Sequence, residues 1–134
     1  MNAFIVELKN KPGELARVTE VLAQKGINII GFSGATCGDA GSVVLLTNDE
    51  SGTRRALHDA HLKMREVELV PATIADMPGS LAEAARRLAN AGVNIEAAIP
   101  TGMSGSNITV AFATDNPTKA RMALGEGVLV ASNR

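Results

Sequence analysis

Aromatic residues are scarce in this chain. It has no tryptophan and no tyrosine, and three of its 134 residues are phenylalanine. Base-stacking surfaces like those of single-strand nucleic-acid-binding proteins therefore cannot be assembled. The charges nearly cancel, with 13 basic and 14 acidic residues, so the chain offers no basic surface to a phosphate backbone. We expect no nucleic-acid partner.

Cysteine and long apolar runs are also nearly missing. Cys37 is the single cysteine, which excludes an internal disulfide. The N-terminus lacks a basic segment followed by a long apolar stretch, and no apolar run approaches the roughly 20 residues that cross a bilayer. We therefore expect a cytoplasmic protein that makes no contact with a membrane.

Motifs for catalysis or metal binding are missing as well. His58 and His61 are three residues apart on a predicted helix, but no further Cys or His cluster completes a metal site, so a solvated helix face is the better interpretation. Cys37 has no His near it in sequence and is interpreted as structural or incidental. The sequence predicts no enzyme, no cofactor and no metal site.

The chain does contain an internal repeat. Residues 10–15 read NKPGEL, and residues 76–81, which lie 66 positions later, read DMPGSL. At the same offset GINI at 26–29 becomes GVNI at 92–95. No insertion or deletion is needed to hold this register from the first turn to the third predicted strand. The repeat predicts a duplicated unit.

Each copy shows the same order of expected elements. Apolar patterns predict strands at 4–8, 28–36, 43–46 and 67–70, with helices after residues 12 and 49. The second copy has the corresponding strands at 72–75, 108–113 and 128–130, with the GVNI segment and a hairpin at 103–105 between the first two and helices after residues 78 and 116. We predict an α+β fold of two βαββαβ units in tandem, spanning residues 1–70 and 71–134.

The Pro-Gly turns determine how two of these helices begin. Pro12 and Pro78 are expected at the first helical position, preceded by Lys11 and Met77, which cannot act as caps. Backbone N–H groups would then be free to bind an anion. These groups belong to residues 13–15 and 79–81. Water, or the side chains of Asn10 and Asp76 folding back, would satisfy them equally well.

We make a separate prediction for the effect of Gly79→Ala on stability. Glycine in a helical first turn carries an entropic cost, so Gly79→Ala should leave the protein as stable or slightly more stable, provided that the backbone there is helical.

The strand, the Asn-Lys-Pro-Gly-x-Leu turn, the helix and the Gly-Ile-Asn-Ile segment together resemble the ACT domain family of small-molecule-sensing regulatory modules. The resemblance implies that both units have a ferredoxin-like βαββαβ fold with antiparallel sheets and that units pair through their sheets. It also implies binding of an amino acid where the strand-to-helix loop of one unit meets its partner. Asn10, Asn28, Asp76 and Asn94 match the positions that contact the effector in the serine-sensing members.

The predicted ligand-binding residues follow from these loops. Helix starts offer donors for a carboxylate, and Asn or Asp side chains offer acceptors for an ammonium. We expect the second loop to hold the better site, because Glu14 opposes a bound carboxylate in the first. Asn28 and Asn94 have a simpler interpretation, in which each only ends a turn. The full predicted set is Asn10, Lys11, Pro12, Gly13, Glu14, Leu15, Asn28, Ile29, Asp76, Met77, Pro78, Gly79, Ser80, Leu81, Asn94 and Ile95.

The expected partners are an amino-acid effector and a second copy of the chain. Residues 43–46 are apolar on both alternating faces, which is typical of a strand buried on both sides. Either the two copies of the repeat cover each other's sheets, or a second chain covers them in a homodimer or larger assembly. An alternative function is a regulatory subunit that docks on an amino-acid biosynthetic enzyme.

Overall fold

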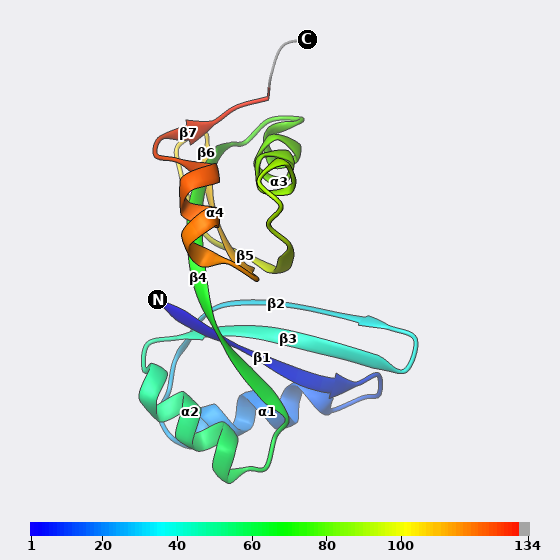
Figure 1. The fold of residues 1–134 in the computed structure, drawn as a ribbon. Helices are drawn as coiled ribbons and strands as arrows, with labels where there is room; N and C mark the ends of the chain where they lie inside the picture. The colour runs from blue at the N-terminus through cyan, green and yellow to red at the C-terminus, as the bar shows by residue number, and fades with distance from the viewer. Residues whose placement is uncertain (132–134) are drawn as a thin grey trace. The chain divides into compact units, whose positions relative to one another are not determined.

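The computed structural model describes residues 1–131 and divides into two compact units, shown in Figure 1. The first unit comprises residues 2–67, and the second comprises Met1 and the residues from Glu68 on. The elements are β1 (Asn2–Lys9), α1 (Glu14–Ala23), β2 (Ile29–Cys37), β3 (Ala40–Thr47), α2 (Glu50–Asp59), β4 (Met64–Ala75), α3 (Ser80–Asn90), β5 (Ile95–Ser104), β6 (Asn107–Thr114), α4 (Pro117–Leu124) and β7 (Val128–Leu129).

The two sheets have equivalent strand orders. In the first unit the order is β2-β3-β1 followed by the first residues of β4, and in the second it is β5-β6 followed by the rest of β4, with β7 beside β4. The pairings β1–β3, β2–β3, β4–β6 and β5–β6 are antiparallel. This arrangement confirms the predicted pair of ferredoxin-like βαββαβ units.

β4 belongs to both units. The sequence suggests two short strands, at 67–70 and 72–75, but β4 runs without a break from Met64 to Ala75. The units divide between Val67 and Glu68, inside this strand. The boundary expected after residue 70 lies within the same strand.

Each unit buries its own apolar core between its sheet and its helices. Phe4, Val18, Leu22, Leu45 and Leu57 are fully buried in the first unit. The second unit buries its own set at the corresponding place, which includes Val70, Ala84, Leu88, Phe112 and Leu124. In Figure 1, α1 and α2 lie together on one face of the first unit's sheet.

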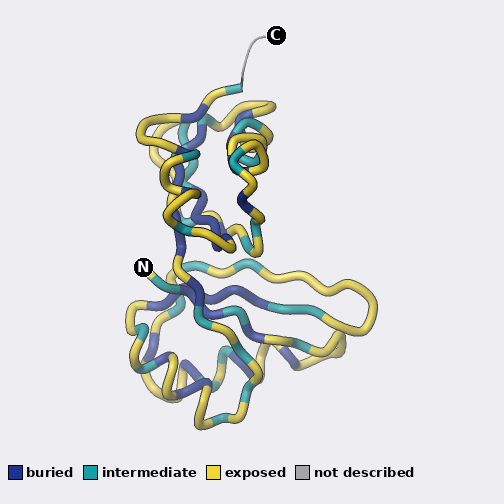
Figure 2. Tube along the Cα trace, viewed as in Figure 1, coloured by how far each residue is buried: buried dark blue, intermediate teal, exposed yellow. Residues whose placement is uncertain are grey.

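The third strand of the repeat is buried on both faces, as its sequence predicts. Residues 43–46 are all buried in the single chain, which Figure 2 shows as dark blue along β3. A homodimer requires a different argument, which comes from the edge of the sheet.

The second copy contains one extra residue, which corrects the expectation of a constant offset. Phe4 corresponds to Val70, 66 residues later, but its partner Leu45 corresponds to Phe112, 67 residues later. The register of β5 shifts between Pro100 and Gly102. Thr101 is the inserted residue, and a β-bulge absorbs it without disturbing the strands on either side.

The last strand departs from the antiparallel pattern. β7 pairs in parallel with β4, with Thr73 beside Val128 and Ile74 beside Leu129. The helix before it, α4, is capped as the sequence predicts: the Asn116 side chain accepts from the N–H of Lys119 at 3.0 Å, and Pro117 follows. Within residues 1–131, no helix is long and apolar enough to cross a membrane.

Candidate functional site

The turns that begin α1 and α3 differ from the sequence prediction. The helices start at Glu14 and Ser80, so Pro12 and Pro78 precede them and are not their first residues. Gly13 and Gly79 are the N-caps, with φ of 88° and 89°. These angles lie in the left-handed region, which favours glycine because it has no Cβ. The glycines are therefore required by the backbone, and the helical φ assumed for Gly79→Ala is wrong.

The first-turn donors are only partly free. Neither helix has a side-chain cap, so the expected alternative of Asn10 and Asp76 folding back as caps is not observed. The N–H of Ser80 donates to the carbonyl of Met77 at 3.3 Å. The Oγ of Ser80 is buried and has no hydrogen-bond partner.

The two glycines have different surroundings. A Cβ added to Gly13 would meet nothing within 4 Å, whereas a Cβ added to Gly79 would lie 2.8 Å from the Cβ of Ala131. The segment after β7 thus lies against the second turn. The first turn is open at the corresponding place.

Glu14 is held by the end of the preceding strand. Its Oε1 accepts a 3.0 Å hydrogen bond from the N–H of Lys9, and its Oε2 lies 3.3 Å from Nε of Arg17. The Lys9 bond, followed by the bonds from Arg17, lowers the pKa of this carboxyl, while burial opposes the shift. The charges of Arg17 and Lys11 lower it further. The carboxylate is thus already engaged within the chain.

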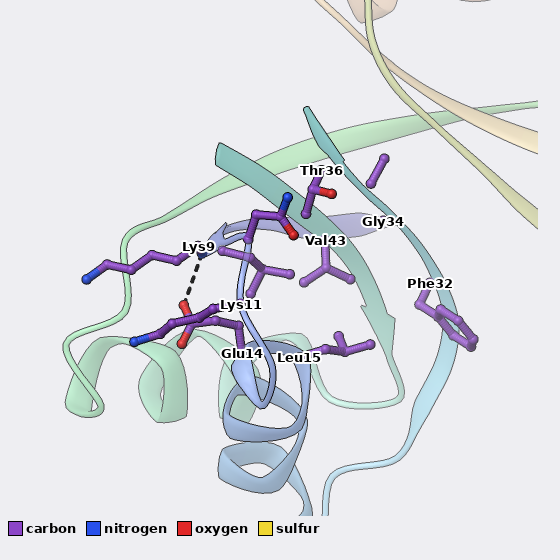
Figure 3. Close-up of a pocket in the computed structure, with 11 residues that line it drawn as sticks. Lys9, Lys11, Glu14, Leu15, Phe32, Gly34, Thr36 and Val43 are labelled. Carbon is purple, nitrogen blue, oxygen red and sulfur yellow. Dashed lines mark hydrogen bonds between the residues drawn. The ribbon is translucent and has the colours of Figure 1, made fainter. Parts of the chain in front are cut away.

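A cavity of about 360 Å³ opens beside the first turn, between β1, α1 and β2. In Figure 3 the side chains of Lys9 and Lys11 extend to the same side as the Glu14 carboxylate, away from Leu15 and Phe32. We call this cavity the first cavity. It is lined by Leu8, Lys9, Asn10, Lys11, Glu14, Leu15, Phe32, Gly34, Ala35, Thr36 and Val43.

The second copy has a cavity of similar size, about 380 Å³, at the equivalent place. We call it the second cavity. Its lining contains no basic residue, because Ala75 and Met77 stand where the first copy has Lys9 and Lys11. It is lined by Ile74, Ala75, Asp76, Met77, Leu81, Ala98, Ile99, Pro100, Ile108 and Val110.

The structure brings some of the predicted residues together and separates others. Asn10 lies at the first cavity and donates through Nδ2 to the carbonyl of Gly38 at 2.8 Å. Asn28 and Asn94 are not among the residues that line the cavities of their units. The backbone N–H of Asn28 donates to the side-chain oxygen of Asn48, and its carbonyl accepts from the Asn48 N–H; Asn94 and Asp115 are joined in the same way. These contacts suit the simpler interpretation, in which the asparagine ends a turn.

Sequence reasoning missed the wall of the first cavity that β2 provides. Phe32, Gly34, Ala35 and Thr36 come from this strand, which is distant in sequence from the turn. A usable signal was present: Phe32 is the one large aromatic residue in a strand of small residues and isoleucine, and it is 65% exposed. A single exposed apolar residue carries little information, but Ile30 on the same strand is also exposed, at 54%, and large exposed apolar residues grouped together mark interaction sites.

The residues considered for metal binding form no site. Within the part of the chain that the structure describes, no group of three or more His, Cys, Asp or Glu could hold a metal ion. Cys37 is a free, exposed thiol.

Comparisons with known proteins agree with this architecture. A family model described as an ACT domain pair matches residues 1–130. Among proteins with curated functions, none matches the chain. A solved structure of protein BT0572 from Bacteroides thetaiotaomicron is similar, with 28% identity and a TM-score of 0.74, covering 92% of this chain and 85% of that one.

Regulatory subunits of aspartate kinase share the fold. The ligand-free subunit from Thermus thermophilus superposes with a TM-score of 0.63 at 20% identity, covering 92% of this chain and 87% of that one. The subunit from Thermus flavus gives 0.64 at 18% identity, covering 92% and 88%.

Proposed function

The chain belongs to the family of paired ACT domains, and we propose that it is a non-catalytic regulatory protein that binds an amino acid in its first cavity. The observation that carries the proposal is the first cavity itself, which has cationic side chains at one end and apolar side chains at the other. An α-amino acid needs a cationic partner for its carboxylate, acceptors for its ammonium, and a place for its side chain.

The residues of the first cavity can meet each need. Lys11 and Lys9 supply positive charge for the carboxylate. Thr36 and the side-chain oxygen of Asn10, whose Nδ2 is engaged with Gly38, supply acceptors for the ammonium. Glu14 is bound to Lys9 and Arg17, which limits its opposition to a ligand carboxylate.

The remaining predicted site residues stay predictions, including the preference for the second loop. Two features of the second cavity favour the first loop as the ligand site instead. Asp76 is the one charged residue in the lining of the second cavity, and Ala131 lies against Gly79. A zwitterion there would have an acceptor for its ammonium but no cation for its carboxylate.

We further propose that the chain forms a homodimer through the outer edge of β2. In its own unit β2 pairs with β3 alone, and residues 29–37 contain no charge and no proline. Ile30 and Phe32 on this strand are 54% and 65% exposed. The equivalent strand β5 carries Glu96, Pro100 and the Thr101 bulge, devices that protect a sheet edge from pairing. Because Phe32 and Gly34 line the first cavity, a partner on this edge would also cover the ligand.

An alternative function is a regulatory subunit that docks on an amino-acid biosynthetic enzyme. Two of the similar structures are regulatory subunits of aspartate kinase. Within this chain, the exposed side chains of Met77 and Leu81 at the second cavity would suit a protein partner.

A thermal-shift screen of the full chain against the twenty amino acids tests the main proposal. An effector present at a hundred times its dissociation constant should stabilise the protein by about 2.7 kcal/mol, which raises the melting temperature by several degrees. No shift with any amino acid, confirmed by calorimetry, would reject the proposal. Purification from the native cell tests the alternative, since a dedicated subunit should bring down one enzyme in stoichiometric amount.

A further inference from the structure

We propose that the effector of the first cavity is an amino acid with a large apolar side chain, of the size of leucine or phenylalanine. This inference rests on the function proposed above and adds the class of ligand. It comes from the end of the cavity that lies away from the lysines, where Leu15, Phe32 and Val43 form the wall.

An adjoining, separate cavity of about 200 Å³ shares Leu15 and Phe32 with the apolar end of the first cavity. Apolar surface therefore extends beyond the first cavity on the side away from the lysines. The adjoining cavity is lined by Leu15, Thr19, Ile29, Phe32 and Leu45. Its walls, which come partly from α1 and β2, offer apolar surface to a long ligand side chain.

The one polar side chain in that lining has its donor engaged. Oγ1 of Thr19 donates to the carbonyl of Leu15 at 2.9 Å, within its own helix. Its hydroxyl oxygen can still accept one hydrogen bond, but the lining offers no charge, so a charged ligand side chain would lose its water without gaining an ionic partner, which is costly. An apolar side chain would gain from leaving water in proportion to the area that it buries.

The exposure of the wall residues supports the same ligand. Leu15 is 48% exposed and Phe32 is 65% exposed. A bound apolar side chain would cover part of both. Nearer the lysines, the Glu14 carboxylate is engaged with the N–H of Lys9 and with Arg17, so it does not offer an unpaired charge to a basic side chain.

Calorimetric titration of the full chain tests the inference. Leucine, methionine and phenylalanine should bind at least tenfold more tightly than serine, aspartate and lysine. Tighter binding of a polar amino acid would overturn the inference and leave the proposed function intact. Binding of no amino acid would reject the proposed function, and the inference with it.

A variant of the wall locates the side chain. Leu15→Ser should weaken leucine binding by about tenfold or more, while the affinity for alanine, whose methyl group is too short to reach Leu15, should change less than twofold. The matched control is Leu81→Ser, at the equivalent and similarly exposed position of the second copy, which should leave leucine binding unchanged. Equal losses for leucine and alanine in Leu15→Ser, or a loss only in Leu81→Ser, would overturn the inference.

Discussion

The backbone N–H of Lys9 donates a 3.0 Å hydrogen bond to Oε1 of Glu14, which joins the end of β1 to the first residue of α1. The bond spans the Pro-Gly turn and fixes the backbone of Lys9 against the start of the helix. The second copy has Ser80 at this position, too short to act in the same way, and its Oγ is left without a partner.

Removal of the Glu14 carboxylate should destabilise the first unit in a pH-dependent way. Because the folded state lowers the pKa of Glu14, its charged form stabilises the protein above the pKa of the unfolded chain, about 4.3. That contribution is lost as the pH falls through the lower, folded-state pKa. Glu14→Ala should therefore melt below the parent at pH 7, and the difference should shrink at pH 3.

Glu14→Gln separates the hydrogen bond from the charge. Its amide oxygen can still accept from Lys9, so thermal denaturation at pH 7 should place it between the parent and Glu14→Ala. A difference between parent and Glu14→Ala that is the same at pH 7 and pH 3 would contradict a role for the charge.

Alanine at the two N-cap glycines should destabilise both turns to different extents. The left-handed φ should cost about 1–2 kcal/mol in each variant. Gly79→Ala also places a Cβ 2.8 Å from Ala131, so its loss should be larger unless the segment after β7 shifts away. Urea denaturation measures both losses, and the double variant Gly79→Ala with Ala131→Gly should recover the excess. Equal losses in the two single variants would mean that Ala131 does not press on the turn.

Exchange of the residue before Pro12 should weaken effector binding in the first cavity. Lys11→Met gives the first turn the residue that the second turn has at Met77. If Lys11 pairs with the ligand carboxylate, the variant should lose about 1–3 kcal/mol of binding free energy in calorimetry. The control Met77→Ala should bind as the parent does. Unchanged affinity in Lys11→Met would place the carboxylate elsewhere.

A charge on the edge of β2 should prevent dimerisation. Ile30→Glu gives β2 a carboxylate like that of Glu96 in β5, and burial of that charge at a strand pair is unfavourable. Sedimentation at micromolar concentration should show a dimer for the parent and a monomer for the variant. Met122→Glu, at a residue that is 79% exposed on α4, should remain dimeric. A parent protein that sediments as a monomer would reject the dimer.

The repeat was enough to predict the fold but not the backbone at its turns. Apolar periodicity around Val18, Leu22 and Leu88 identified the helices, because these side chains form the cores. The rule that proline begins a helix misplaced Pro12 and Pro78, since an Asn-Lys-Pro-Gly segment also suits a turn in which the glycine takes a left-handed φ. The residue types alone do not distinguish a helix that begins at the proline from a turn whose glycine has a left-handed φ.

The sequence of the Pro-Gly turn did not predict that β2 forms a wall of the first cavity. Phe32 reaches the first cavity because β2 pairs with β3 and faces α1, and such strand pairings are long-range relationships. The comparison of the two repeat sequences did not detect the inserted Thr101 for a related reason. A bulge changes which residues face each other while leaving the apolar pattern on either side intact.

The two halves of the repeat share the strand β4, which runs through the boundary between the units. A slip of one residue along a strand turns its side chains to the opposite face, and β4 carries buried residues for both units: Val67 for the first, and Val70 and Ile74 for the second. A cut at the boundary therefore falls inside a strand, and each half expressed alone would end or begin at a broken strand whose register fixes its buried residues.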